Sequence, residues 1–454
     1  MKNSGEKRYL LLLTTVALGT MLNPLNSSMI AIALARLQEE FHLTFSDASW
    51  LISTYYLASG IGQPVMGKLS DIYGQKRLFL WGLFLIAAAS LLAPLSPNFG
   101  WLLVFRIVQA IGSSTLFPAG MGIVRRIITT NQAKALGVLS IFSSTSAAFG
   151  PSVGGFLLHF GDWPAVFLIN LPFILSSFIL AIRILPKDSG MPKQKARIDL
   201  AGVALFSAMI ISWLLFLLSL EQTVNWWMLI AGILLAGFFY KLESTREDPF
   251  IDVKSLRKNV NVTLIYAQFI LVNTIFYSVF FGVPSYLQNV HHFDAKNSGL
   301  MMLSIAGFGV IITPLVGRWI DRSGAKPALT VGAAVLTIGV LLMLSVHDQT
   351  SAVWMFLIFS VLGISNGFNN LSMQSALYAH VEPSETGTAS GLFMTSRYIG
   401  TILSSSLLGV LFGKQITTAH FHEIAVVCAV IAAIVLMLTI RMPNAVARQK
   451  AGSR

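Results

Sequence analysis

The residues that could do chemistry in this chain are few, and they are charged side chains set among long apolar stretches. Two arginines, Arg106 and Arg397, fall well inside such stretches, whereas the 19 acidic residues all lie at their ends or outside them. A guanidinium in a low-dielectric environment is costly unless it faces water, polar groups or an anion. Arg106, Gln109 and Arg397 therefore predict a polar, positively charged cavity. Snorkelling of Arg106 to the membrane surface is the alternative, because Arg106 lies near the start of its stretch.

A second set of charged residues lies in two loops that read almost the same. Both loops follow Gly-Lys/Arg-x-x-Asp-x-x-Gly-x-Lys, at 67–76 and 317–326. The glycines allow close approach and positive φ, and each aspartate needs a partner such as a helix N-terminus. A contact between each aspartate and such a helix would hold the protein in one conformation, and we call it the conformational latch. Its expected members are Gly67, Asp71, Gly74, Lys76, Arg77, Gly317, Asp321 and Gly324. Plain turn capping is the alternative, but the matched repeat favours the latch.

The repeat also predicts where the two aspartates bind. Pseudo-twofold symmetry places Asp71 beside the start of the helix near Gly387, and Asp321 beside the start of the helix near Ala133.

The elements that must position these residues are apolar segments long enough to cross a membrane. Hydrophobic residues make up 55% of the 454 positions and charged residues 11%, against roughly 25% charged in soluble proteins. Segments of the length that a bilayer requires recur fourteen times. They are about 9–34, 48–67, 78–95, 99–124, 134–158, 164–185, 200–220, 225–241, 262–288, 297–317, 327–346, 352–378, 387–412 and 423–441.

The spacing of the repeat predicts the domain organisation. Six helices with their loops fill residues 1–186 and again 260–454, and the segment 187–259 supplies two inserted helices. The predicted fold is an all-α integral membrane protein with two six-helix bundles and fourteen transmembrane helices. We expect the inserted helices to lie outside the bundles; a hairpin that does not span the membrane is the alternative.

The distribution of basic residues predicts the orientation. Most of the 31 Lys and Arg residues fall in loops on one side, which places both termini in the cytoplasm. The net charge of +12 thus reflects membrane topology, and its spread over short loops disfavours a nucleic-acid partner. The short loops suggest a bacterial cell membrane.

Three motifs together resemble a known family. The loop Gly67–Arg77 is similar to the motif after the second helix of the major facilitator superfamily. Gly150-Pro151-Ser152-Val153-Gly154-Gly155 is similar to its antiporter element G-P-x-x-G-G, and Arg106–Gly112 to its R-x-x-Q-G-x-G, with Ala110 replacing a glycine. With fourteen spans, the chain resembles the fourteen-helix drug:proton antiporter family. The resemblance implies export of small amphipathic molecules or drugs by alternating access, coupled to protons.

Helix five of this plan carries a possible hinge. Gly150, Gly154 and Gly155 favour close packing, and Pro151 frees a backbone carbonyl, so the helix can bend. Ordinary helix packing is the alternative for the glycines.

The chain departs from the resembled family in helix one. Where the family has L-D-x-T-I-V-N-V-A-L-P, this chain has Asn26 in place of the acid. An amide cannot titrate, so proton coupling needs another group. Asp162 is the first candidate and Asp47 the next, with solvated loop residues as the alternative reading. Two arginines without a buried acid favour neutral, zwitterionic or anionic cargo over lipophilic cations.

The cargo site is expected among polar residues of the apolar stretches. They are Asn23, Asn26, Tyr55, Tyr56, Gln268, Asn273, Tyr277, Asn366, Asn369 and Asn370. Amides with aromatic walls suit amphipathic molecules, whereas hydrogen bonding between helices is the alternative role.

No enzyme is expected, because the chain has no Walker A, HExxH or GxSxG motif. No cofactor or metal site is expected either, since no histidine pair has metal-site spacing. The expected partners are a small-molecule substrate, protons and the bilayer, with the chain acting as a monomer. The alternatives are an exporter of one metabolite, lipid or anion, and a membrane sensor that does not transport.

Overall fold

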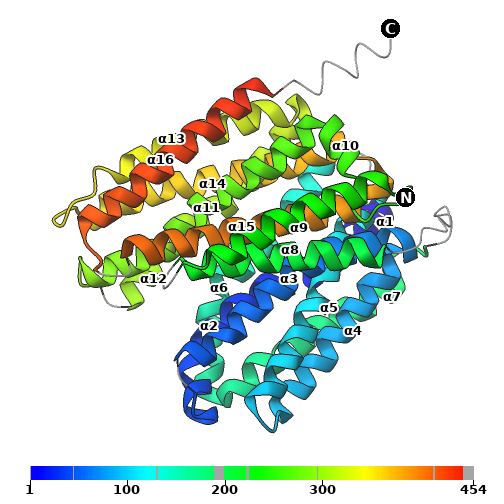
Figure 1. The fold of residues 1–454 in the computed structure, drawn as a ribbon, viewed down its shortest axis with the longest axis horizontal. Coiled ribbons are helices and arrows are strands. Elements are labelled where there is room, and N and C mark those ends of the chain that lie inside the picture. The colour runs from blue at the N-terminus through cyan, green and yellow to red at the C-terminus, as the bar shows by residue number, and fades with distance from the viewer. Residues whose placement is uncertain are drawn as a thin grey trace. The chain divides into compact units, whose positions relative to one another are not determined.

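The computed structural model describes residues 2–43, 45–128, 131–188, 199–220, 224–293, 295–412 and 415–442. Within these ranges the chain is helical, with turns and short connections but no strand. The helices are α1 (Lys2–Thr20), α2 (Leu22–Phe41), α3 (Phe45–Tyr73), α4 (Gln75–Leu92), α5 (Phe99–Ile127), α6 (Gln132–Leu168), α7 (Asn170–Ile184), α8 (Leu200–Ser219), α9 (Trp226–Thr245), α10 (Val253–Lys258), α11 (Val260–Asn289), α12 (Ala295–Ser323), α13 (Ala325–Met343), α14 (Ala352–His380), α15 (Thr386–Phe412) and α16 (Thr418–Arg441), with 3₁₀ turns η1 (Ala93–Leu95) and η2 (Pro383–Glu385) (Figure 1).

Each predicted apolar stretch is helical, although the stretch 9–34 runs from α1 into α2 and the stretch 164–185 runs from the end of α6 into α7. Eleven helical segments of the described chain are long and apolar enough to cross a membrane. α3 and α15 are not among them, because Gly, Ser, Thr and charged side chains lower their mean hydropathy, and Val153–Ile184 counts as one segment. The all-helical membrane architecture is therefore confirmed, whereas the count of fourteen spans stays a prediction.

The chain divides into two compact units. Unit 1 comprises Met1–Ile198 with Glu382–Thr395, and unit 2 comprises Asp199–Val381 with Ser396–Arg454. Helix packing repeats within them: α5 packs on α3 and α4 in unit 1, and α14 packs on α12 and α13 in unit 2. Likewise α1 packs on α7, and α11 packs on α16. The matched packing agrees with the internal repeat in the sequence.

Two interruptions shape the helices of unit 1. α1 and α2 meet at Met21, where Pro24 has no N–H to donate to the preceding turn. α6 is interrupted at Asp162, whose φ of 56° and ψ of −171° are not helical. The break at Asp162 falls between the predicted stretches 134–158 and 164–185.

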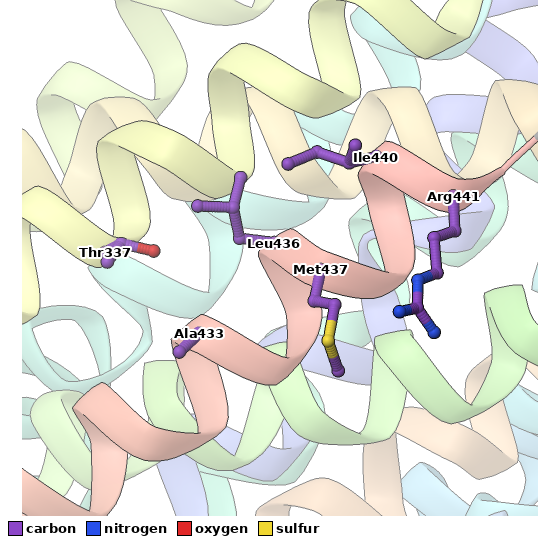
Figure 2. A pocket seen from close by; sticks show the side chains of 6 residues that line it. All are labelled: Thr337, Ala433, Leu436, Met437, Ile440 and Arg441. Carbon is purple, nitrogen blue, oxygen red and sulfur yellow. The ribbon is translucent and has the colours of Figure 1, made fainter.

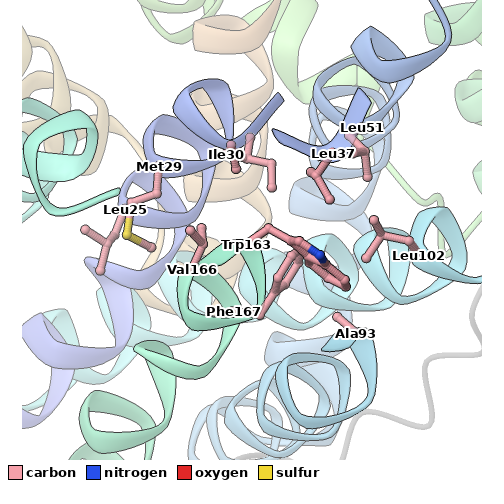
Figure 3. Close-up of a cluster of buried hydrophobic side chains, with 11 residues drawn as sticks. Leu25, Met29, Ile30, Leu37, Leu51, Ala93, Leu102, Trp163, Val166 and Phe167 are labelled. Carbon is pink, nitrogen blue, oxygen red and sulfur yellow. The ribbon is translucent and has the colours of Figure 1, made fainter. Parts of the chain in front are cut away.

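An apolar core of unit 1 surrounds Trp163 and Phe167, which directly follow the interruption of α6 at Asp162. They pack against side chains of α2, including Met29 and Ile30, and against Leu102 of α5 (Figure 3). Removing apolar surface from water contributes roughly 25 cal/mol per Å² to the free energy of folding. This contribution is smaller between helices in lipid, so close packing supplies more of the stability.

The inserted pair belongs to unit 2, where α8 packs on α9. Asp199 caps α8 by accepting from the Gly202 amide at 2.9 Å, and its other oxygen lies 3.4 Å from Arg246. The buried carboxylate of Glu243 accepts from the Ile251 amide at 2.8 Å. These bonds fasten the start of α8 and the end of α9 to the following loop.

Candidate functional site

A buried polar network surrounds Arg106 in unit 1. Arg106 is 1% exposed, so it does not snorkel to the surface. Its guanidinium donates to Gln109 Oε1 at 2.6 Å and to the Asn26 carbonyl at 2.9 Å. It also lies 4.1 Å from the centroid of the Tyr55 ring, a cation–π contact. Carbonyl, amide and ring partners therefore stabilise this charge in place of a carboxylate.

Asn26 occupies the centre of the network. Its Oδ1 accepts from Asn170 Nδ2 at 2.8 Å and from Gln109 Nε2 at 3.2 Å. Its Nδ2 is buried and has no hydrogen-bond partner among the described residues. A carboxylate has two acceptor oxygens, whereas an amide has one acceptor oxygen and one donor nitrogen. The two donors on Oδ1 and the unpartnered Nδ2 are therefore the pattern expected where an amide replaces a carboxylate. Asn170 was not singled out from the sequence, because a lone Asn at a helix start carries no signal.

The aromatic and amide residues next to this network also meet. Asn23 Nδ2 donates to Ser113 Oγ at 3.0 Å, and the Tyr55 hydroxyl lies 3.0 Å from the same oxygen. Tyr56 packs edge-on to Tyr55 with ring centroids 6.3 Å apart and stays half-buried. The structure thus brings together the unit 1 members of the predicted cargo site.

The corresponding site in unit 2 is more open. Arg397 is half-buried and donates one hydrogen bond, from Nη2 to Asn370 Oδ1 at 3.2 Å. Asn370 Nδ2 in turn donates to Asn366 Oδ1 at 2.5 Å. The guanidinium lies 5.7 Å from the Phe269 ring centroid, and its Nε has no partner among the described residues. Arg397 therefore keeps donors that another molecule can use.

Other predicted cargo residues of unit 2 form bonds within and between helices. Gln268 accepts from Thr439 of α16 at 2.9 Å, Asn273 donates to the Phe269 carbonyl at 2.7 Å, and Asn369 donates to the Ser365 carbonyl at 3.0 Å. Tyr277 packs among the rings of α11. The Gln268 contact fits the alternative role of hydrogen bonding between helices, whereas Asn273 and Asn369 bond within their own helices.

The predicted contact of Asp71 is present. Asp71 Oδ1 accepts from the Gly387 amide at 3.0 Å, and Oδ2 accepts from the Thr388 amide and hydroxyl, both at 2.9 Å. Asp71 lies beyond the predicted span 48–67, and burial of its carboxylate raises its pKa to about 7, although these hydrogen bonds and Lys68 oppose the rise. The contact therefore favours the protonated acid more than water does.

Close backbone contact surrounds this acid. A Cβ at Gly67 would overlap the Gly387 carbonyl, and a Cβ at Gly391 would overlap the Gln63 carbonyl. Thr395 completes the row by donating to the Gly60 carbonyl at 2.7 Å. Gly67 is thus required for helix packing inside α3 and not for a turn. The turn is made by Gly74, with φ of 106°, and its repeat partner Gly324 has φ of 82°.

Two contacts between the start of α4 and the end of α7 were missed from the sequence. Asp188, which follows α7, accepts from the amides of Lys76 and Arg77, each at 3.1 Å, and so caps the start of α4. Lys76 Nζ donates to the Ile182 and Leu185 carbonyls at the end of α7, at 2.9 and 2.7 Å. Such reciprocal capping joins segments about 110 residues apart, which no local pattern reveals.

Arg125 of α5 reinforces the Asp71 contact. It donates to Thr386 Oγ1 at 2.9 Å and to the Glu382 carbonyl at 3.2 Å, next to the residues that Asp71 binds. Gly317 and Asp321 lie near the end of α12, in unit 2, whereas Ala133 belongs to unit 1. The contact expected for Asp321 stays a prediction.

Asp162, the first candidate for proton coupling, lies in an ion pair with a residue of α2. Both its oxygens accept from Arg36 at 2.9 Å, and the side chain is 45% exposed. A paired guanidinium favours the ionised acid, so Asp162 suits a structural bridge between α2 and the break in α6. The side chain of Asp47 lies outside the described residues.

The predicted hinge glycines lie at a helix crossing. A Cβ at Gly150 would overlap Ser28 Oγ, and one at Gly154 would lie 3.1 Å from the Met29 carbonyl. Gly155 has open space beside it, and the side chain of Pro151 lies outside the described residues. Gly150 and Gly154 are therefore explained by packing of α6 on α2, and a hinge stays a prediction.

The fold and the apolar spans define a multi-span membrane protein, and comparison with known proteins names its family. The model of the Major Facilitator Superfamily matches residues 16–405, so the chain belongs to this superfamily. It is a transporter and not an enzyme, as the sequence predicted.

Individual relatives span nearly the whole chain. The chain is 45% identical to the "Uncharacterized MFS-type transporter YwoD" of Bacillus subtilis over 96% of this chain and 98% of that protein. It is 28% identical to the "Tetracenomycin C resistance and export protein" of Streptomyces glaucescens, covering 89% and 76%. The crystal structure of the human organic anion transporter MFSD10 (TETRAN) shares the fold, with a TM-score of 0.70, 14% identity, and coverage of 95% and 99%.

Proposed function

We propose that this chain is a secondary active exporter of small amphipathic molecules that prefers neutral and anionic cargo to lipophilic cations. We further propose that it spans a bacterial cell membrane fourteen times, with both termini in the cytoplasm, and acts as a monomer by alternating access. The three-segment plan of 1–186, 187–259 and 260–454 is part of this proposal.

One observation carries the cargo preference. Arg106 and Arg397 lie in long apolar helices, and neither forms an ion pair with any residue that the structure describes. A cation held by neutral groups leaves a positive potential around it, which attracts anions and repels cations. Arg397, with its spare donors beside Asn370, is the better placed of the two to bind a carboxylate or phosphate group.

Export is supported by a relative. The Streptomyces glaucescens protein is named for resistance and export, and it matches most of this chain. Its cargo does not transfer at 28% identity, and we take from this relative only the direction of transport, because the match covers 89% of this chain.

Proton coupling needs a titrating group, and Asp71 fits better than Asp162. Its pKa of about 7 in the buried contact lies near physiological pH, whereas Asp162 is held ionised by Arg36. Protonation of Asp71 would favour the contact with Gly387 and Thr388, and deprotonation would favour its release. The latch would then respond to protons directly.

The test is transport in everted membrane vesicles with a matched panel of cationic, neutral and anionic amphiphiles, with and without a pH gradient. We expect gradient-dependent uptake of neutral and anionic compounds and little uptake of cations. Strong transport of monovalent cations would refute the cargo preference, and transport that ignores the gradient would refute proton coupling. Binding without any transport would instead support a sensor.

A further inference from the structure

We propose that the groove between α13 and α16 binds one anionic phospholipid of the cytoplasmic leaflet, with an acyl chain in the groove and the phosphate on Arg441. This inference concerns a lipid bound to the bilayer-facing surface of unit 2 and does not depend on the proposed cargo.

The groove has the size and lining for a single chain. Its volume is about 280 Å³, below the roughly 300–1,000 Å³ of drug-sized pockets. Its walls are Thr337 of α13 and Ala433, Leu436, Met437 and Ile440 of α16. The Thr337 hydroxyl donates to the Ala333 carbonyl at 2.9 Å, so no unsatisfied polar group faces the groove from this wall.

A cation stands at one end of this apolar groove. Arg441 is the last residue of α16, is exposed, and makes no hydrogen bond or ion pair with any described residue. Met437 and Arg441 are one turn apart and project from the same side of α16 (Figure 2). Arg441 lies eight residues after Ala433, so the groove extends about 12 Å along the helix.

The orientation of α16 identifies the leaflet. The predicted topology places the end of α16 in the cytoplasm, and a span of about 12 Å covers most of a leaflet whose hydrocarbon is about 15 Å deep. An unpaired guanidinium at headgroup depth, directly continuous with an apolar groove, is complementary to an amphiphile with an anionic head. A neutral headgroup would leave the Arg441 donors without an anionic partner.

A second groove in unit 2 serves as an internal control. It has a volume of about 350 Å³, lies between α11 and α15, and includes Phe281, Leu408 and Gly409. No charged side chain lines it. If apolar shape alone selected lipids, the two grooves would bind them alike, whereas a headgroup preference should depend on Arg441.

The experiment is native mass spectrometry of the full-length protein titrated with phosphatidylglycerol or phosphatidylcholine of identical chains. We expect wild type to retain one phosphatidylglycerol with roughly fivefold preference, the factor that one basic residue near an anionic surface provides. Arg441→Gln should abolish the preference, and Ala433→Trp should remove the bound lipid whatever its headgroup. The controls are Gly409→Leu in the second groove and Arg183→Gln, an exposed arginine in the last turn of α7.

Several outcomes would overturn the inference. These are equal retention of the two lipids by wild type, an unchanged preference in Arg441→Gln, and unchanged retention in Ala433→Trp. Loss of a dimer in Ala433→Trp without loss of lipid would assign the groove to a second copy of the chain. Displacement of the lipid by inorganic phosphate alone would show that Arg441 binds free anions. Because no readout here is transport, failure of this proposal leaves the proposed function untouched.

Discussion

Arg106 of α5 and Arg397 of α15 differ in how much of each guanidinium is bonded within its own unit. Arg106 of unit 1 is 1% exposed and bonded to Gln109 and Asn26 beneath the Tyr55 ring. Arg397 of unit 2 is half-buried and donates one hydrogen bond, to Asn370. We therefore expect Arg106 to stabilise unit 1, whereas Arg397 keeps hydrogen-bond donors that a bound molecule could use.

Removing the first arginine should have the largest effect. Arg106→Met keeps the side-chain volume but leaves Gln109 Oε1 and the Asn26 carbonyl buried without this donor. Unsatisfied buried groups cost about 1–3 kcal/mol each, so we expect about 3 kcal/mol of destabilisation and loss of transport. Thermal unfolding in detergent measures the first effect. Unchanged melting would place the stability of unit 1 elsewhere.

The same experiment on Arg397 should separate binding from folding. Arg397→Gln removes one hydrogen bond between two half-buried side chains, so the free energy of unfolding should change by less than about 1 kcal/mol. Uptake of anionic cargo should fall at least about tenfold, because a charge pair at an effective dielectric near 20 contributes a few kcal/mol. Uptake of neutral cargo is the internal control and should hold. Equal loss of both cargo types would show that Arg397 is structural.

Asn26→Asp would introduce the acid that the resembled drug:proton antiporter family carries in helix one. The new carboxylate would keep the bonds from Asn170 and Gln109 and would lie beside Arg106, whose charge it would neutralise. We expect transport of lipophilic cations to rise about tenfold and thermal stability to be kept or raised. A resistance profile against cationic dyes measures the gain. If wild type already exports these dyes strongly and the variant matches it, the charge comparison is wrong.

A smaller, pH-dependent effect is expected at the Asp71 contact. Its pKa is about 7 when buried against α15 and near the ordinary 3.8 when exposed. Because the buried form binds the proton more tightly, the contact strengthens as pH falls through about 7, is complete below about 4, and weakens as pH rises through 7.

Labelling of a cysteine at Ser70 reports this contact, since Ser70 is buried beside Gly387. Ser70→Cys should be protected at pH 5.5 and react several-fold faster at pH 8.5, normalised at each pH to Tyr73→Cys, which is 52% exposed. Native Cys428 is buried and should contribute little signal. Asp71→Asn should remove the pH dependence and lower transport, because its latch no longer releases. If labelling of Ser70→Cys does not depend on pH while Asp71 is present, the pH-dependent release of the Asp71 contact is wrong.

The smallest effect is expected at the cap of α4. Asp188→Ala removes the acceptor for the Lys76 and Arg77 amides, and loss of such a cap costs about 1 kcal/mol. Thermal unfolding should shift slightly, with transport retained. Asp248→Ala, in the loop after α9, is the matched control. A shift as large as that of Arg106→Met would give Asp188 a greater role than capping.

The sequence by itself determined the apolar helical segments, the internal repeat and the superfamily. Apolar length and the loops around Asp71 and Asp321 are local signals, because a membrane helix satisfies its own backbone and needs only its own residues. The contact of Asp71 with the helix near Gly387 could also be predicted, since symmetry and the helix dipole act on a single carboxylate.

Only the tertiary structure decided which polar residues serve which site. Gln268 and Asn26 read alike in the sequence, yet one bonds Thr439 across a helix pair and the other accepts two amides beside Arg106. Asp162 changed from a candidate for coupling to the partner of Arg36, and Asp188 emerged as a cap from across the unit. The physical reason is that hydrogen bonds and charge pairing depend on distances of about 3 Å between residues far apart in the chain, and no periodicity encodes such distances.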